Sequence, residues 1–268
     1  MITLYSINQF KDQNCTKTPT RILKYRIVYL VSGNAEIRID QTDFTMKAHQ
    51  VLTITSGQIH YFTALKGQLY ILDFPLEFIC KDDHDIELIF HNGLFCHFGE
   101  NELITLNGPT DFTQTIQNIA VELKNQQFQY QIAIKGDIEK LLIAINRTKI
   151  TNGDLLWKPD ALFLKFLEKV RNTFAGNHSV SDYARLLQTT ETRLNEVSKL
   201  HTSKTAQNVI FSLKVSEAKR LLLYQDLSIK EVAYQLGFSD PYYFSNFFKK
   251  HTGRSPKDYK TSIVAPHP

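Results

Sequence analysis

The C-terminal part of the chain contains the same short pattern twice. The run from Lys199 to Thr205 (KLHTSKT) returns 50 residues later as Lys249 to Ser255 (KKHTGRS). Upstream, SVSDYA at 179–184 matches SIKEVA at 228–233 with an offset of 49, so one residue is inserted between the matched pieces. Self-similarity at a fixed spacing indicates a duplicated supersecondary unit. We therefore expect two similar modules in this part of the chain.

The second copy carries the signals of two short helices joined by a tight turn. Ser228 and Glu231 have the spacing of a capping box, which begins a helix. Gly237 suits the left-handed residue that ends one. Asp240 and Pro241 suit the cap and the first position of the next helix. Two short helices with a glycine-containing turn predict a helix-turn-helix.

The second of these predicted helices has an apolar face and a polar face. Phe244 and Phe248 are four residues apart and are expected to be buried together. Such a helix has the size and surface to enter the major groove of DNA. The same arrangement also occurs in plain helical bundles, so geometry alone leaves both interpretations open. The polar face consists of Tyr242, Ser245, Asn246 and Lys249.

Charge favours the nucleic-acid interpretation. The segment before Trp157 is typical of a linker, so we divide the chain into residues 1–157 and 158–268. The first part has 14 Lys and Arg against 17 Asp and Glu, a net charge of −3, and the second has 17 against 10, a net charge of +7. A basic domain attracts polyanions such as nucleic acid. A solvated basic surface is the alternative.

Residues from about 20 to 108 favour short strands and those from about 110 to 150 favour helices. Apolar Ala35, Ile37 and Ile39 alternate with charged neighbours, as in a half-buried strand. Many short strands at this spacing indicate a sandwich or barrel. The turns between them are expected at 32–34, 40–43, 56–57 and 66–67.

An apolar stripe at i, i+3, i+4 and i+7 predicts an amphipathic helix after the strands. This stripe would either pair two subunits or pack on the same chain, and both possibilities stay open. It consists of Ile116, Ile119, Ala120 and Leu123.

The densest resemblance covers Ser228 to Tyr259, including IKEVA, LGFSD, YYFS, FKK, TG and SPKDY. This segment resembles the signature of the AraC/XylS family of bacterial transcription regulators. A weaker likeness extends over about 164–260, with a joining helix at about 205–225. The resemblance implies an all-α domain at 158–268 with two helix-turn-helix units, each placing one helix in successive major grooves.

The resemblance also implies which residues contact DNA. Asn246 would bind adenine through two hydrogen bonds, and Lys249 would bind phosphate. The first copy departs from the family pattern, since Gln188 replaces the turn glycine, Ser198 a core aromatic residue and Ser203 another glycine. The implied DNA contacts are Thr190, Thr192, Arg193, Asn195, Glu196, Tyr242, Tyr243, Ser245, Asn246 and Lys249.

Residues 1–157 resemble, in patches, the cupin-like jelly roll that serves this family as a sensor and dimerisation domain. The resemblance implies a small-molecule effector inside the barrel, with Tyr29, His60 and Tyr70 as candidate ligand contacts. Control by dimerisation or a protein partner alone, with an empty barrel, is the second possibility.

A metal-dependent cupin enzyme is the rival class. It would need clustered histidine and carboxylate ligands, but no histidine lies between Thr20 and Gly33, and the other N-terminal histidines lack ligand spacing. We therefore expect no catalytic residue, metal or cofactor, with His60 packed or hydrogen-bonded. The three cysteines, Cys15, Cys80 and Cys96, are unpatterned, which indicates reduced thiols in a cytoplasmic protein.

The sequence thus predicts a multidomain DNA-binding regulator, an activator that acts on double-stranded promoter DNA together with RNA polymerase. We expect a homodimer in the bacterial cytoplasm, associated with the nucleoid. The start of the chain has no basic flank followed by an apolar stretch, so no secretory signal is expected. No run of about 18 apolar residues predicts a membrane span.

Overall fold

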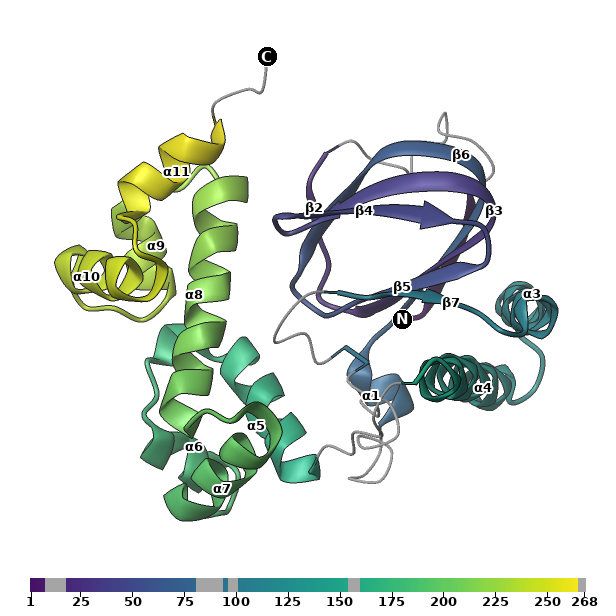
Figure 1. The fold of residues 1–268 in the computed structure, drawn as a ribbon. Coiled ribbons are helices and arrows are strands. Elements are labelled where there is room, and N and C mark those ends of the chain that lie inside the picture. Colours follow the sequence, from purple (N-terminus) through teal and green to yellow (C-terminus); the bar gives the residue numbers. More distant parts are fainter. Residues whose placement is uncertain (8–17, 81–93, 96–100, 154–159, 265–268) are drawn as a thin grey trace. The chain divides into compact units, whose positions relative to one another are not determined.

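The computed structural model describes residues 1–7, 18–80, 94–95, 101–153 and 160–264. It divides into two compact units, residues 1–159 and 160–268. The predicted linker around Trp157 lies outside the described residues, as do Cys15 and Cys96. The N-terminal unit is rich in strands and ends in helices, and the C-terminal unit is helical, which confirms the predicted fold class at this level (Figure 1).

In the residues that the structure describes, the strands of the first unit form one antiparallel sheet of seven strands that curls round on itself (Figure 1). Its order is β1-β6-β3-β5-β7, with β2 paired to β6 and β4 to β3. Inward-facing aliphatic side chains such as Val28, Leu52 and Ile71 fill the interior, which removes apolar surface from water. The strands are β1 (Thr3–Ile7), β2 (Thr20–Arg21), β3 (Tyr25–Ile39), β4 (Thr42–Lys47), β5 (Gln50–Ile54), β6 (Ile59–Phe74) and β7 (Leu103–Thr105).

Two of the four predicted turns are wrong. The chain turns at 40–41 and near 55–58, but the segments 32–34 and 66–67 lie inside the long strands β3 and β6. Gly33 and Gly67 face each other there, and a Cβ on either would lie within 2 Å of a carbonyl oxygen of the opposite strand. The glycines therefore mark a close approach of two backbones rather than chain reversals.

The described residues of the first unit also form the helices α1 (Leu76–Ile79), α3 (Pro109–Asn125) and α4 (Tyr130–Thr151). The four side chains of the predicted apolar stripe on α3 differ in burial. Ile116 and Ile119 are fully buried within the monomer, Leu123 is half-buried and Ala120 is exposed. Since α3 packs on α4, the two isoleucines belong to the core of this unit, as in the second of the two possibilities, and a subunit-pairing role of the stripe stays a prediction.

The second unit contains seven α-helices in its described part. Its helix α8 (Ala206–Tyr224) joins two helical pairs and is close to the predicted 205–225. The remaining helices are α5 (Ala161–Asn172), α6 (Val180–Leu186), α7 (Glu191–Thr202), α9 (Ile229–Gln235), α10 (Pro241–Thr252) and α11 (Pro256–Val264), with a 3-10 turn, η2, at Phe174–Gly176.

The two helical pairs, α6–α7 and α9–α10, repeat each other down to their caps. Ser228 and Glu231 form the predicted capping box, and Ser179 forms the equivalent box with Asp182. These reciprocal bonds satisfy amide groups that a helix start leaves free. The duplication seen in the sequence is therefore a duplication of structure.

Candidate nucleic-acid interface

The α9–α10 turn holds α10 through several local bonds. Gly237 has φ +78°, the left-handed conformation that glycine adopts without strain. The Phe238 amide donates to the carbonyl of Ala233 over 3.0 Å. Asp240 then caps α10 by accepting from the Tyr242 amide at 2.6 Å. These bonds fix the direction in which α10 leaves the turn.

Helix α10 divides into a buried and an exposed face, as predicted. Phe244 and Phe248 are fully buried, in a cluster with side chains of α8, α9 and α11. Tyr242 and Tyr243 are 69% and 65% exposed, which is unusual for large aromatic side chains and leaves them available to a partner.

The remaining α10 candidates differ in their freedom. Ser245 is half-buried, and its hydroxyl donates to the carbonyl of Pro241 in its own helix. Asn246 and Lys249 are exposed, and in the described part of the chain neither side chain has a hydrogen bond or ion pair. Their polar groups can therefore form new bonds without breaking existing ones.

The corresponding side chains of α7 are already engaged within the chain. The Arg193 guanidinium pairs with Asp160 at 2.9 Å and with Glu196 at 3.4 Å. Asn195 accepts from the Ala206 amide at 3.0 Å and so satisfies the first amide of α8. Asn195 therefore holds the start of the joining helix, a role that its position on the polar face of α7 did not predict.

Two further α7 candidates lie at its first turn. Thr190 is the N-cap, and its hydroxyl accepts from the Arg193 amide at 3.1 Å. Thr192 is exposed beside it.

The helices α7 and α10 also differ in charge. Helix α7 carries Glu191 and Glu196 against two cations, whereas α10 carries Lys249 and Lys250 and no acid.

Comparison with known proteins identifies this part of the chain. Residues 183–262 match a family model described as a helix-turn-helix domain. The C-terminal unit carries a helix-turn-helix domain of the AraC/XylS family. The family resemblance predicted from the sequence is thereby confirmed for this unit.

Curated relatives of this AraC/XylS domain are named as regulators. A helix-turn-helix regulator of Pseudoalteromonas carrageenovora is 32% identical over 35% of this chain and 55% of its own length. The activator RhaS of Enterobacter is 27% identical over 45% of this chain and 43% of its length. The chain thus spans about half the length of these two relatives.

Two similarities extend over nearly the whole chain at low identity. The Msm operon regulatory protein of Streptococcus mutans is 20% identical over 96% of this chain and 93% of its own. A crystal structure of ToxT from Vibrio cholerae with a bound unsaturated fatty acid is 17% identical, with a TM-score of 0.46, over 100% of this chain and 97% of that one.

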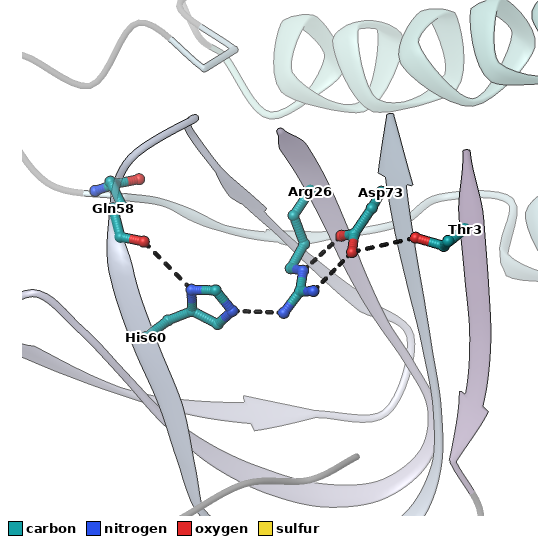
Figure 2. Close-up of polar contacts among 5 residues, drawn as sticks. All are labelled: Thr3, Arg26, Gln58, His60 and Asp73. Atoms are coloured by element: carbon teal, nitrogen blue, oxygen red, sulfur yellow. Dashed lines mark hydrogen bonds and ion pairs between the residues drawn. The ribbon is translucent and has the colours of Figure 1, made fainter. Parts of the chain in front are cut away.

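The N-terminal unit has a second candidate site, a cavity of about 400 Å³ between strands. Arg26 on β3 and Asp73 on β6 form a buried ion pair at 2.6 Å there, and a further guanidinium nitrogen donates to His60 Nε2 (Figure 2). Thr3 donates to Asp73 from β1. Of the residues in this cluster the sequence predicts only His60 as a ligand contact, because no local pattern connects Arg26 with a carboxylate 47 residues away.

Both ring nitrogens of His60 face protein groups. Arginine can only donate, so Nε2 accepts and Nδ1 carries the proton, which points to the Gln58 carbonyl at 3.5 Å. Burial and the Arg26 charge lower the pKa of His60 to about 4, so the ring is neutral at pH 7. The described residues contain no cluster of three metal-binding side chains.

The two other candidate ligand contacts lie apart from the cavity lining. The Tyr29 hydroxyl bonds with Thr113 at 3.0 Å and donates to the Pro109 carbonyl at the start of α3. Burial raises the pKa of Tyr29. Tyr70 accepts a bond from Gln68 at 3.2 Å. Neither side chain lines the cavity, and Tyr29 connects the sheet to α3 instead.

None of the helices in the described part of the chain combines the length and apolar character that crossing a lipid bilayer requires.

Proposed function

We propose that this protein is a sequence-specific DNA-binding transcription regulator. The observation that carries the proposal is the outer face of α10, where exposed Tyr242, Tyr243, Asn246 and Lys249 stand on a firmly capped helix above a buried aromatic core. A helix held in this way can enter the major groove with its side chains free to contact base edges.

The two helices would contribute differently to binding. Asn246 would form two hydrogen bonds with adenine, which discriminates against the wrong base by about 1–3 kcal/mol. The tyrosines would contact phosphates or thymine methyl groups, and Lys249 and Lys250 would bind phosphates. Helix α7 would contribute the weaker of two boxes, through exposed Thr192 and through Arg193, which must leave Asp160 before it can reach DNA. Phosphate contacts supply affinity that falls as salt rises.

Regulation by a small polar molecule in the N-terminal cavity is a further part of the proposal. The cavity lining carries hydrogen-bonding groups, including Tyr5, Thr20, Lys24 and His60, together with the apolar side chains of Ile22, Leu23, Phe62 and Ile71. Such a ligand would shift the regulator between states only by its differential affinity for them. An empty cavity, with control by dimerisation or a protein partner, is the second candidate mode.

We also propose that the protein activates transcription with RNA polymerase, acts in the cytoplasm at the nucleoid and works as a homodimer. Ala120 and Leu123 stay available on α3 for subunit contacts, since both keep exposed surface. No catalytic group is needed for this role.

The decisive experiment is selection of bound duplexes from a random-sequence DNA library by the full chain, followed by titration of the enriched sequence at several salt concentrations. The expected result is a consensus with two separate boxes about one helical turn apart. Affinity should fall steeply with salt, with a slope of about −0.9 for each phosphate contact. Enrichment of no sequence over the input would overturn the proposal.

Effector control is tested separately, by thermal unfolding of the full chain across a panel of small polar metabolites. A ligand that binds only the folded state raises the melting temperature, and the rise grows with the ratio of ligand concentration to its dissociation constant. Arg26→Met changes a side chain that lines the cavity and should abolish that rise. If no compound changes the melting temperature, the empty-cavity mode is favoured.

A further inference from the structure

A buried lysine lies where the two helix-turn-helix units meet. Lys214, at the middle of α8, is 3% exposed, and its Nζ donates to Asn177 Oδ1 at 2.7 Å. The same ammonium lies 5.2 Å from the ring centre of Phe238. Asn177 leads into α6 of the first helix-turn-helix unit, and Phe238 belongs to the α9–α10 turn of the second helix-turn-helix unit. One amine therefore contacts both units.

The backbones around this amine are also in close contact. A Cβ placed on Gly237 would lie 2.7 Å from the carbonyl oxygen of Ala175 and 2.9 Å from the amide nitrogen of Asn177. The turn between α9 and α10 thus packs directly against the segment that precedes α6, at the start of the first helix-turn-helix unit. We name Asn177, Lys214, Gly237 and Phe238 the three-way junction.

Burial of an ammonium is costly, so a purely structural position would favour an apolar side chain. Burial lowers the pKa of Lys214 to about 8, which still leaves the amine mainly protonated at neutral pH. The long stem of methionine would fill the same space without this penalty. The lysine gains what methionine lacks, a directional bond to Asn177.

We propose that Lys214 is a positioning residue, which fixes the angle between α7 and α10 so that both helices fit adjoining grooves of one duplex. The inference rests on the proposed DNA-binding function and adds to it a residue outside both base-contacting faces. Because hydrogen bonds to base edges require donor–acceptor distances of 2.7–3.2 Å, a small change of angle at the junction would misplace one helix when the other is bound.

The test compares Lys214→Met with the wild-type full chain on two duplexes taken from the library selection. One duplex carries both boxes, and the other has the box of the first unit scrambled. We expect the variant to bind the two-box duplex about tenfold more weakly, as is typical of coupling between sites. Affinity for the one-box duplex should be unchanged, and the melting temperature should be equal or higher.

Three matched variants separate positioning from charge and from folding. Lys219→Met makes the same charge change on the same helix, beside Tyr259 instead of the junction, and should not discriminate between the duplexes. Asn177→Asp keeps an acceptor for Lys214 and should behave as wild type, whereas Asn177→Gly removes the acceptor in a backbone conformation that glycine tolerates and should reproduce the loss.

The outcomes distinguish the two proposals. If the wild-type chain enriches no sequence, the proposed function fails. If it enriches only a one-box sequence, or if Lys214→Met weakens both duplexes equally or neither, DNA binding stands and the positioning role is overturned. If the Lys214→Met chain does not fold, Asn177→Gly decides. A loss of affinity confined to the two-box duplex then supports the positioning role, and a loss that is equal on both duplexes, or absent, excludes it.

Discussion

The two helix-turn-helix units have the same architecture but use matched positions for different purposes. Phe248 fills the core of the second unit, whereas the equivalent Ser198 is buried with a hydroxyl that has no hydrogen-bond partner in the described structure. Gly237 turns the chain without strain in the second unit, whereas Gln188 adopts φ +54° in the first. The second unit is therefore better packed and less strained.

The polar faces differ in the same direction. On α10 the side chains of Asn246 and Lys249 are free in the described structure, while on α7 Asn195 holds α8 and Arg193 pairs with Asp160. A repeated fold thus does not imply a repeated site. The second helix-turn-helix unit keeps polar side chains free for a partner, whereas two side chains on the corresponding face of the first are already bonded within the chain.

The largest expected difference between the units lies in their cores. Phe248→Ala should lower the free energy of unfolding by about 3–5 kcal/mol, because it removes a buried aromatic ring and leaves a cavity. The matched Ser198→Ala should be neutral or stabilising by about 1 kcal/mol, since it removes a buried hydroxyl without a partner. Urea denaturation followed by circular dichroism measures both, and equal losses would contradict the comparison.

The turns should show the next largest difference. Gly237→Ala should destabilise the chain by about 3 kcal/mol, from left-handed strain together with the clash against Ala175. Gln188→Gly should be neutral or stabilising by less than about 1 kcal/mol, because strain relief is offset by added freedom of the unfolded chain.

Gly253→Ala is the control for the turn comparison, since Gly253 has φ +76° but no atom within 4 Å of a Cβ. Gly253→Ala should lower the free energy of unfolding only by the strain of a left-handed alanine, about 1 kcal/mol. Thermal unfolding of the three variants would contradict the interpretation if Gly253→Ala were as damaging as Gly237→Ala.

The paired asparagines separate base contact from support. Asn246→Ala should relax preference at one base pair, by about 1–3 kcal/mol of discrimination, and leave stability unchanged. Asn195→Ala should leave base preference unchanged and reduce stability by about 1 kcal/mol, because the first amide of α8 loses its acceptor. Library selection measures base preference, and thermal unfolding measures stability, for both variants. The interpretation would be contradicted if Asn195→Ala relaxed base preference and Asn246→Ala reduced stability instead.

The smallest effect concerns the ion pair on α7. Asp160→Asn keeps the cap of α5 but releases Arg193 from a carboxylate. Because exposed pairs contribute at most about 1 kcal/mol, DNA affinity should rise by no more than about fivefold. The salt slope should steepen by about one phosphate contact. The double variant that combines Asp160→Asn with Arg193→Gln should lose this gain in DNA affinity. A gain that persisted would show that it does not come from the release of Arg193.

Much of the C-terminal unit could be predicted because its signals are local. The capping box at Ser228, the cap at Asp240 and the aromatic pair Phe244 and Phe248 each depend on residues within four positions of one another. The strand region was less predictable. Gly33 and Lys66-Gly67 have the sequence pattern of turns, since a glycine that permits close approach of two strands has the same local signature as one that reverses the chain.

The amino-acid sequence by itself determined the duplicated units, their helix boundaries and the polar face of α10, because periodicity and caps act over a few residues. Only the tertiary structure decided which polar side chains remain free. Asn195 meets Ala206, Arg193 meets Asp160 and Lys214 meets Asn177 across 11 to 37 positions. Such partners are chosen by how helices pack, and periodicity specifies the face of a helix but not what that face contacts.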